Sequence, residues 1–180
     1  LADPHRLIIR GRSVAGYTAL SALTFGDLFD AGGIHYGVSD LESLARGSLP
    51  SASIYLEELV GPYPERMDLY KERSPLHRAE ELSTPTVFFQ GLDDKIVHPS
   101  QTEVMVRSLR DKGLPVSYVT FNREGHRFAR EDSLREALEG ELYFYSRVLN
   151  FPLADLPEPI EMENLGSAAG RSSLSRDPTS

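Results

Sequence analysis

Leu7-Ile8-Ile9-Arg10-Gly11-Arg12-Ser13-Val14-Ala15-Gly16-Tyr17 is the segment of this 180-residue chain that gives the clearest indication of its fold. It begins as an apolar strand, continues as a tight turn of small residues with Ser13 at its apex, and ends as the first turn of a helix. A glycine two residues before the serine lets the strand and the helix approach each other closely. This arrangement holds a serine hydroxyl clear of a sheet, where a reactant can reach it.

Strand and helix patterns alternate along the rest of the chain. Apolar spacing and turn signals predict strands over 6–11, 31–38, 86–90 and 116–121, and helices over 14–25, 54–60, 74–82, 100–112 and 132–149. In the last helix we expect Leu134, Leu138, Leu142, Tyr145 and Leu149 to face the core. This order of elements predicts an α/β fold, in which helices flank a mostly parallel sheet.

The first strand indicates that the sheet is incomplete on its amino-terminal side. Leu7, Ile8 and Ile9 form the continuous apolar run of a parallel strand that is covered on both faces, and the chain starts only a few residues earlier. We therefore expect further strands before residue 1. We also expect one folded domain over residues 1–151 and a disordered tail over residues 152–180, which are rich in Pro, Glu, Ser and Gly.

The composition disfavours several classes of function. The net charge of −8 and the pI near 5.1 argue against nucleic acids and anionic membranes as partners, because their phosphates would be repelled. No apolar run reaches the length of a membrane helix. The absence of cysteine excludes disulfides and thiolate chemistry, so the cytosol is the expected location. The histidines show no metal-ligand spacing, and we expect no metal site.

Two later segments supply partners for the Ser13 hydroxyl. Asp93 and Asp94 follow the strand at 86–90, and His126 follows the next strand, so all these groups lie in loops at the carboxyl edge of the expected sheet. A serine nucleophile needs a base within hydrogen-bond reach and an acid that orients the base. The chain order Ser, Asp, His is that of α/β-hydrolases. Taken singly, the same residues also fit a helix cap and two loop side chains.

Five segments of the chain are distinctive in combination. They are Gly-Arg-Ser-Val-Ala-Gly-Tyr-Thr, Tyr-Gly-Val-Ser-Asp-Leu, Ser-Pro-Leu-His, Phe-Phe-Gln-Gly-Leu-Asp-Asp-Lys-Ile-Val and Glu-Gly-His-Arg-Phe. Together they resemble the catalytic α/β-hydrolase domain of the prolyl oligopeptidase family of serine peptidases, over residues 3–151. Within that family they are most similar to the dipeptidyl and acylaminoacyl peptidase branch.

The resemblance implies a role for each matching residue. Ser13 corresponds to the nucleophile and His126 to the general base. Asp94 corresponds to the acid that orients the histidine, and its neighbour Asp93 is the second choice for that role. The backbone amide of Val14 corresponds to a donor of the oxyanion hole. Further along the chain, Val38, Leu41 and Leu44 correspond to the wall of an apolar pocket for the residue before the scissile bond.

The resemblance also implies an activity and a larger context. We expect hydrolysis of short peptides through an acyl-enzyme, without cofactor or metal. Family members carry a β-propeller and the first strands of the hydrolase domain upstream, so we expect the 180-residue chain to be inactive by itself. A homo-oligomer is compatible with the sequence, which does not determine the oligomeric state.

Two positions depart from the family pattern, and two alternative functions stay open. Arg12 precedes the serine, and Ala15 stands where a second small residue, usually glycine, is found, so we expect the Ala15 methyl group to crowd the contact between strand and helix. The first alternative is a carboxylic-ester hydrolase on the same fold, because a triad alone does not choose between amide and ester. The second is a truncated, non-catalytic copy that acts as a binding module.

Overall fold

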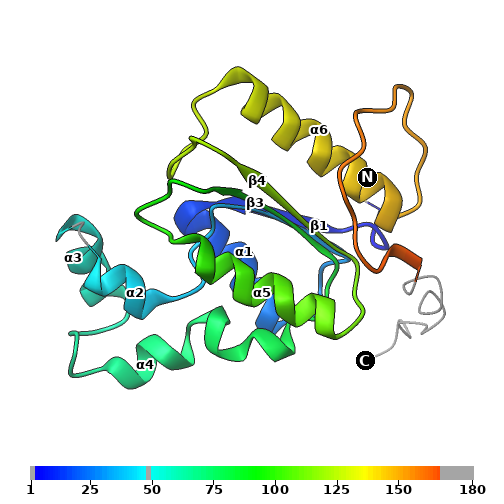
Figure 1. Cartoon of the computed structure of the whole chain (residues 1–180). Coiled ribbons are helices and arrows are strands. Elements are labelled where there is room, and N and C mark those ends of the chain that lie inside the picture. Colours follow the sequence, from blue (N-terminus) through cyan, green and yellow to red (C-terminus); the bar gives the residue numbers. More distant parts are fainter. Residues whose placement is uncertain (1–2, 48–49, 167–180) are drawn as a thin grey trace, which may run out of the picture.

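The computed structural model describes residues 3–47 and 50–166 of the chain, and it contains a four-stranded parallel sheet at its centre (Figure 1). The strands are β1 (Ile8–Arg12), β2 (Ala31–His35), β3 (Thr86–Gly91) and β4 (Val116–Phe121), and they lie side by side in chain order. The helices are α1 (Ser13–Phe25), α2 (Leu41–Arg46), α3 (Pro50–Leu59), α4 (Met67–Glu72), the 3₁₀ helix η1 (Pro75–Glu81), α5 (Pro99–Asp111) and α6 (Glu131–Val148). The expected α/β-hydrolase class and its parallel sheet are confirmed.

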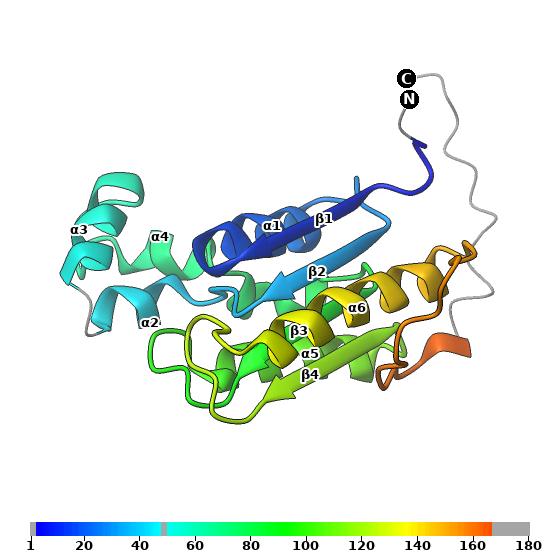
Figure 2. The same ribbon diagram turned by 90° about the horizontal axis from the view of Figure 1, so that it is seen from above.

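All four strands run in the same direction, so their carboxyl ends form one edge of the sheet. Ile34 of β2, for example, pairs with Gly11 of β1 on one side and with Phe88 of β3 on the other. Figure 2 shows the strand arrows pointing toward the end of the molecule where α2, α3 and α4 lie. The loops that follow β1, β3 and β4 therefore meet at this edge.

Helices cover both faces of the sheet. On one face, α1 and α5 pack on the strands around Ile34 and Phe88, and Leu20 and Leu109 are fully buried there. On the other face lies α6 (Figure 2), and Phe144 of this helix is buried in an apolar cluster that also includes Ile160 from the segment after α6. Removal of this much apolar surface from water is the main source of stability for such a layered fold.

The segment between β2 and β3 forms a separate apolar cluster at the carboxyl edge. It contains α2, α3 and α4 and buries Val38, Leu41, Leu44, Leu56 and Tyr70, together with Val97 from the loop after β3. The sequence predicts only the second half of α3, because no apolar period dominates this stretch. Figure 1 shows the three helices grouped beyond the ends of the strands. This cluster therefore supplies a wall at the edge where the candidate residues lie.

The exposure of β1 differs from the sequence expectation of a strand covered on both faces. Within the described residues β1 is an edge strand that pairs only with β2, and Ile8 is 37% exposed. Arg10 is also on the surface, while Gly11 is buried. An apolar run indicates that a strand belongs to a sheet, but its position in the sheet depends on the neighbours that pair with it.

The face that α6 presents to the sheet also differs from the expectation. Leu134, Leu138 and Leu142, expected in the core, are 43%, 58% and 45% exposed, whereas the other two residues of that expectation, Tyr145 and Leu149, are buried and partly buried. The buried face instead carries Ser133, Ala137, Gly140, Glu141, Phe144 and Tyr145. Gly140 leaves room on this face for the segment after α6, because an added methyl group would lie 2.8 Å from the Ile160 side chain. Glu141 favours the same face, because its hydrogen-bond partners Arg10 and His35 lie on β1 and β2.

The region after residue 151 is not uniformly a tail. Residues 160–163 return to the edge of β4, where the Glu163 amide donates to the carbonyl of Val116 over 2.9 Å and Ser117 Oγ donates to the Glu161 carbonyl over 2.6 Å. Ile160 packs with the α6 cluster. The expected disorder is therefore wrong for this part of the segment, because β4 offers unpaired backbone groups that it satisfies. Residues 167–180 lie outside the described residues.

In the parts of the chain that the structure describes, no helix is long and apolar enough to cross a lipid bilayer.

Candidate active site

Ser13 lies at the junction of β1 and α1, in a backbone conformation that serine rarely adopts. Its φ is +53°, in the left-handed region. The sharp turn requires glycine on both sides: a methyl group at Gly11 would lie 2.1 Å from the Ala15 carbonyl oxygen, and one at Gly16 would lie 2.6 Å from Gly37 Cα. Non-glycine residues in such strained positions are found mainly at functional sites. The sequence motif thus produces the expected serine at the apex.

Ala15 does not crowd this junction, contrary to the sequence expectation. Ala15 is exposed, whereas Gly11 and Gly16 occupy the two close approaches between strand, helix and the loop after β2. The side chain of Ala15 points away from the sheet because the helix turns by about 100° per residue after Ser13. The extra methyl group is therefore accommodated.

Hydrogen bonds connect Ser13, His126 and Asp94 in one line. Ser13 Oγ lies 2.7 Å from His126 Nε2, and His126 Nδ1 lies 3.0 Å from Asp94 Oδ2. A carboxylate only accepts hydrogen bonds, so the proton of the neutral imidazole is assigned to Nδ1. Nε2 then presents its lone pair and accepts the hydrogen bond from the serine hydroxyl. This is the arrangement in which an imidazole can remove the serine proton.

Asp94, rather than its neighbour Asp93, faces the histidine. Asp94 is 2% exposed, and its Oδ1 accepts hydrogen bonds of 2.9 Å from the amides of Ile96 and Val97. Burial raises the pKa of this carboxyl, but the hydrogen bonds from His126 and from the two amides outweigh burial and lower the pKa below its ordinary value. Asp93 is exposed and turned away from the histidine, in a separate hollow. Asp94 therefore stays ionised near neutral pH.

The loop that carries His126 is fixed by a buried glutamate that the sequence reading missed. Glu124 is 2% exposed, and its carboxylate accepts hydrogen bonds from the amides of Ala129, 2.9 Å, and Arg130, 3.0 Å. Burial raises its pKa, whereas these amide donors lower it by more, so the net shift is downward. The carboxylate thus closes the loop from residue 124 to residue 130 around His126. A buried charge satisfied in this way is costly to disturb.

Two further residues near the histidine were also missed. The ring of Tyr36 meets the His126 ring edge-on, with 5.2 Å between centroids, and Tyr36 itself has a φ of +40°. The buried Gln90 amide donates to Asp94 Oδ2 over 3.3 Å and to the Val97 carbonyl over 3.2 Å. The position of Gln90 at the end of an apolar strand was a sequence signal for its role, because a buried side-chain amide needs hydrogen-bond partners. Both residues hold the imidazole and the carboxylate in place.

The first turn of α1 offers backbone donors beside the serine hydroxyl. The first amides of a helix have no partner within the helix, and no side chain caps this end of α1. The Val14 amide directly follows Ser13 and belongs to this turn. A negative charge that develops on a carbonyl oxygen near Ser13 would therefore meet an amide and the positive end of the helix dipole.

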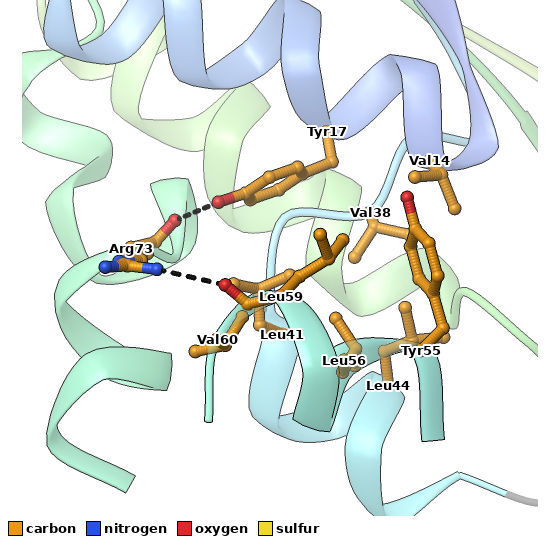
Figure 3. Close-up of a pocket in the computed structure, with 10 residues that line it drawn as sticks. All are labelled: Val14, Tyr17, Val38, Leu41, Leu44, Tyr55, Leu56, Leu59, Val60 and Arg73. Atoms are coloured by element: carbon orange, nitrogen blue, oxygen red, sulfur yellow. Dashed lines mark hydrogen bonds between the residues drawn. The ribbon is translucent and has the colours of Figure 1, made fainter. Parts of the chain in front are cut away.

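A cavity of about 360 Å³ opens next to Val14 (Figure 3). Its lining is mostly apolar and comes from α1, α2, α3 and the ends of their loops: Val14, Tyr17, Val38, Leu41, Leu44, Tyr55, Leu56, Leu59, Val60 and Arg73. Figure 3 shows the Tyr55 hydroxyl pointing toward Val14. The far end is closed by two hydrogen bonds, from Tyr17 Oη to the Arg73 carbonyl over 3.0 Å and from Arg73 Nη1 to the Leu59 carbonyl over 3.4 Å. The three residues expected at a pocket wall all line this cavity.

A second cavity, of about 440 Å³, contains the serine and the histidine themselves. Ser13, Val14, Val38, Leu44, Ile96, His126 and Arg127 line it. Val14, Val38 and Leu44 also line the first cavity, so the two hollows share a wall and Ser13 lies in the second. The site can therefore hold one part of a ligand in an apolar hollow and another part beside the imidazole.

Among the residues that the structure describes, no group of three or more His, Asp or Glu side chains is arranged to hold a metal ion.

Comparison with known proteins identifies the relatives of this chain. The profile of the Prolyl oligopeptidase family matches residues 1–151. Dipeptidyl aminopeptidase BIII of Pseudoxanthomonas mexicana is 35% identical over 134 residues, which cover 71% of this chain and 19% of that protein. The chain thus spans about a fifth of the curated relatives that it matches.

Solved structures show the same fold. A puromycin-hydrolyzing peptidase of Mycobacterium tuberculosis is 40% identical, with a TM-score of 0.83, over 91% of this chain and 25% of that protein. The acylaminoacyl peptidase of Pyrococcus horikoshii is 26% identical, with a TM-score of 0.68, over 86% of this chain and 26% of that protein. The likeness covers the sheet and the helices described above.

Proposed function

The chain belongs to the prolyl oligopeptidase family, and from this premise we propose that it carries the catalytic residues of a serine peptidase. The observation that carries the proposal is the hydrogen-bonded line from Ser13 through His126 to Asp94, which lies beside an apolar cavity. Ser13 is the nucleophile, His126 the general base and Asp94 the acid that orients the base. The residue types and distances fit acyl transfer.

In the first half of the reaction, His126 Nε2 takes the proton from Ser13 Oγ while the oxygen attacks the carbonyl carbon of the substrate. The carbonyl oxygen becomes negative and is stabilised by the Val14 amide at the start of α1. The ionised Asp94 stabilises the imidazolium that forms. The C–N bond then breaks, and His126 gives its proton to the leaving amine. An ester between the acyl group and Ser13 remains.

In the second half, water replaces the leaving amine beside His126. The imidazole takes a proton from this water, which attacks the ester carbonyl, and the proton passes to Ser13 Oγ when the C–O bond breaks. The serine and histidine are then restored. The proton transfers between Ser13 and His126 use the contact of 2.7 Å between Ser13 Oγ and His126 Nε2.

We further propose that the cavity at Val38, Leu41 and Leu44 takes the side chain of the residue before the scissile bond. Its lining is nearly all apolar, and about 360 Å³ is large enough for an aromatic ring, so we expect short peptides with large apolar residues at this position to be preferred substrates. Because two structural neighbours are named for puromycin hydrolysis, puromycin is a suitable additional substrate to test.

The context of the chain belongs to the proposal as well. We propose that residues 1–151 are part of a catalytic domain that functions within a longer peptidase, as in the relatives of which the chain spans about a fifth. A β-propeller upstream and a cytosolic location are expected for the full-length protein. Sequencing of the complete gene and fractionation of cells would check both expectations.

The proposed function is tested by labelling the full-length protein with a fluorophosphonate probe and by following cleavage of an Ala-Phe anilide. The wild-type protein should be labelled and should cleave the amide, and Ser13→Ala should lose the label and lower kcat by at least about 10³-fold. Labelling that persists in Ser13→Ala would assign the nucleophile to another residue. Cleavage of the matching ester, without any cleavage of the amide, would indicate an esterase instead.

A further inference from the structure

Arg127 lines the cavity that contains Ser13 and His126, and its side chain carries a permanent positive charge. It follows His126 directly and is exposed, and the other lining residues of this cavity are Ser13, Val14, Val38, Leu44, Ile96 and His126. A guanidinium remains protonated at all physiological pH values. A ligand that reaches the serine therefore also meets this cation.

The backbone of Arg127 is held on both sides. His126 is bound to Ser13 and Asp94, and the ring of Phe128 is buried against Tyr36 and Phe121, with centroid distances of 4.9 and 4.8 Å. The Glu124 carboxylate closes the loop just beyond it. The base of the Arg127 side chain is thus fixed at the cavity, while its guanidinium remains free to turn toward a ligand.

The guanidinium of Arg127 has no hydrogen-bond or ion-pair partner within residues 3–47 and 50–166. The carboxylates of the neighbouring loops are bound to other groups. Asp94 accepts hydrogen bonds from His126 and from two backbone amides, and Glu124 accepts hydrogen bonds from two backbone amides. Asp93 lines a different hollow, together with Asn122, Arg123 and Arg130. The charge of Arg127 is therefore available to a carboxylate from outside the chain.

The chemistry of the histidine determines which end of a substrate Arg127 meets. His126 passes its proton to the leaving amine, so the leaving group must lie on the His126 side of Ser13. The apolar cavity around Leu41 and Leu59 lies on the other side of the shared wall and fits the acyl part. Arg127 is next to His126 and absent from the lining of the apolar cavity. It therefore faces the leaving group.

We propose that Arg127 binds the terminal carboxylate of the leaving group, so that substrates ending one residue after the scissile bond are preferred. A guanidinium binds a carboxylate through two parallel hydrogen bonds, a geometry that an amide terminus cannot reproduce. The preferred substrate class is dipeptides, or acylated amino acids linked to one free amino acid, with a large apolar first residue. This inference rests on the proposed function, because it uses His126 as the proton donor to the leaving amine.

The test compares two substrates that differ only at the carboxyl end, Phe-Ala and Phe-Ala amide, with the full-length protein at low ionic strength. The wild-type protein should cleave Phe-Ala with a kcat/KM about tenfold higher, mainly through KM, and added NaCl should reduce the difference. Arg127→Gln should bring the ratio of the two kcat/KM values close to 1, and Arg127→Lys should give an intermediate ratio. Arg123→Gln removes a cation from the separate hollow and should keep the wild-type ratio.

Equal kcat/KM values for the two substrates in the wild-type protein would overturn the inference and leave the proposed function intact. The same holds if Arg127→Gln retains the preference while it reacts normally with a fluorophosphonate probe, which would show an intact site. A preference of the wild-type protein for Glu over Phe before the scissile bond, lost in Arg127→Gln, would place the cation on the acyl side and contradict the proposal. Failure to cleave Phe-Ala by a protein that still cleaves the Ala-Phe anilide would overturn the inference alone, whereas failure to cleave all three substrates and to react with the probe would overturn the proposed function as well.

Discussion

Asp93 and Asp94 are adjacent carboxylates with opposite surroundings. Asp94 is buried and accepts hydrogen bonds from His126, Ile96 and Val97, whereas Asp93 is exposed at the rim of another hollow. Only Asp94 can orient the imidazole and stabilise its positive form. The spacing of the sequence motif also favours Asp94. Which of two adjacent aspartates faces the histidine nevertheless depends on how the loop folds.

The two neighbours provide a matched pair of variants. Asp94→Asn keeps the size of the side chain but replaces an accepting oxygen with a donating amide, which favours the wrong histidine tautomer, so kcat should fall by about 10³- to 10⁴-fold. Asp93→Asn should change kcat less than about twofold. Steady-state kinetics with one peptide substrate measures both. A larger loss in Asp93→Asn would show that the loop is arranged differently in the working enzyme.

The pKa of Asp94 also predicts how activity depends on pH in the acidic range. Since the pKa of Asp94 lies below its ordinary value, its charge is retained at neutral pH and is lost only as the pH falls through that lowered pKa. Loss of activity at mildly acidic pH is therefore not assigned to protonation of Asp94.

At the scale of elements, the site depends on two loops that touch each other. Gly91 ends β3, and the loop that follows carries Asp94, while the loop after β4 carries His126. The Asp93 amide donates to the Glu124 carbonyl over 3.0 Å and joins these loops. Because the hydrogen bond between Asp94 and His126 spans the two loops, its length depends on how closely they pack.

Gly91→Ala should separate these loops. The added methyl group would lie 2.4 Å from the Glu124 carbonyl oxygen and 2.5 Å from that of Gly125, both backbone atoms that cannot move alone. A displacement of about 1 Å between acid and base should lower kcat by about 100-fold, with a smaller change in KM, because other elements form the apolar cavity beside Val14. Initial-rate kinetics would measure both constants.

Gly125→Ala is the control for this change. A methyl group at Gly125 would meet no atom closer than 3.9 Å, the Asp93 carbonyl oxygen, although this position is adjacent to His126. Its kcat should stay within about threefold of the wild-type value. If the two variants lost activity equally, contact between the loops would not be the cause.

At the scale of the whole molecule, a buried polar network joins the sheet to α6. Glu141 of α6 accepts hydrogen bonds from Arg10 Nε over 2.9 Å, from Arg10 Nη2 over 2.8 Å, from His35 Nε2 over 3.1 Å and from Tyr145 Oη over 2.6 Å. Burial raises the pKa of Glu141, but the hydrogen bonds from these three residues lower it by more, to about 2. The ionised carboxylate thus stabilises the packing of α6 on β1 and β2.

This lowered pKa predicts a specific acid sensitivity. The folded-state pKa of Glu141 lies below the ordinary value of 4.5, so its contribution is fully present above about pH 4.5 and is lost as the pH falls toward about 2. The contribution corresponds to about 3 kcal/mol at neutral pH. Glu141→Gln should be less stable than wild type by roughly this amount at pH 7, and the two proteins should approach each other in stability near pH 2.

Urea unfolding at a series of pH values from 7 to 2 measures this difference. Tyr145→Phe is a useful comparison, because it removes one donor from Glu141 while the carboxylate keeps Arg10 and His35, so a smaller loss at pH 7 is expected. A constant difference in unfolding free energy between wild type and Glu141→Gln over the whole pH range would show that ionisation of Glu141 contributes nothing.

Features that depend on short stretches of the chain could be predicted from the amino-acid sequence. The order of strands and helices, the turn at Ser13 and the positions of Asp94 and His126 after their strands follow from local apolar periods, glycines and strand ends. Because parallel strands end at one edge, these local patterns were enough to predict that the three side chains lie near one another.

Only the tertiary structure decided which surfaces are covered and which distant groups meet. Leu134, Leu138 and Leu142 have the spacing of a core face, yet the sheet packs against the face with Gly140 and Glu141, where a close approach and a polar network are available. The buried supports of the site, such as the contact of Gln90 with Asp94 and that of Tyr36 with His126, likewise come from contacts between separate segments of the chain. A periodic pattern fixes the faces of a helix, but the partner that covers a face is chosen by packing of the whole molecule.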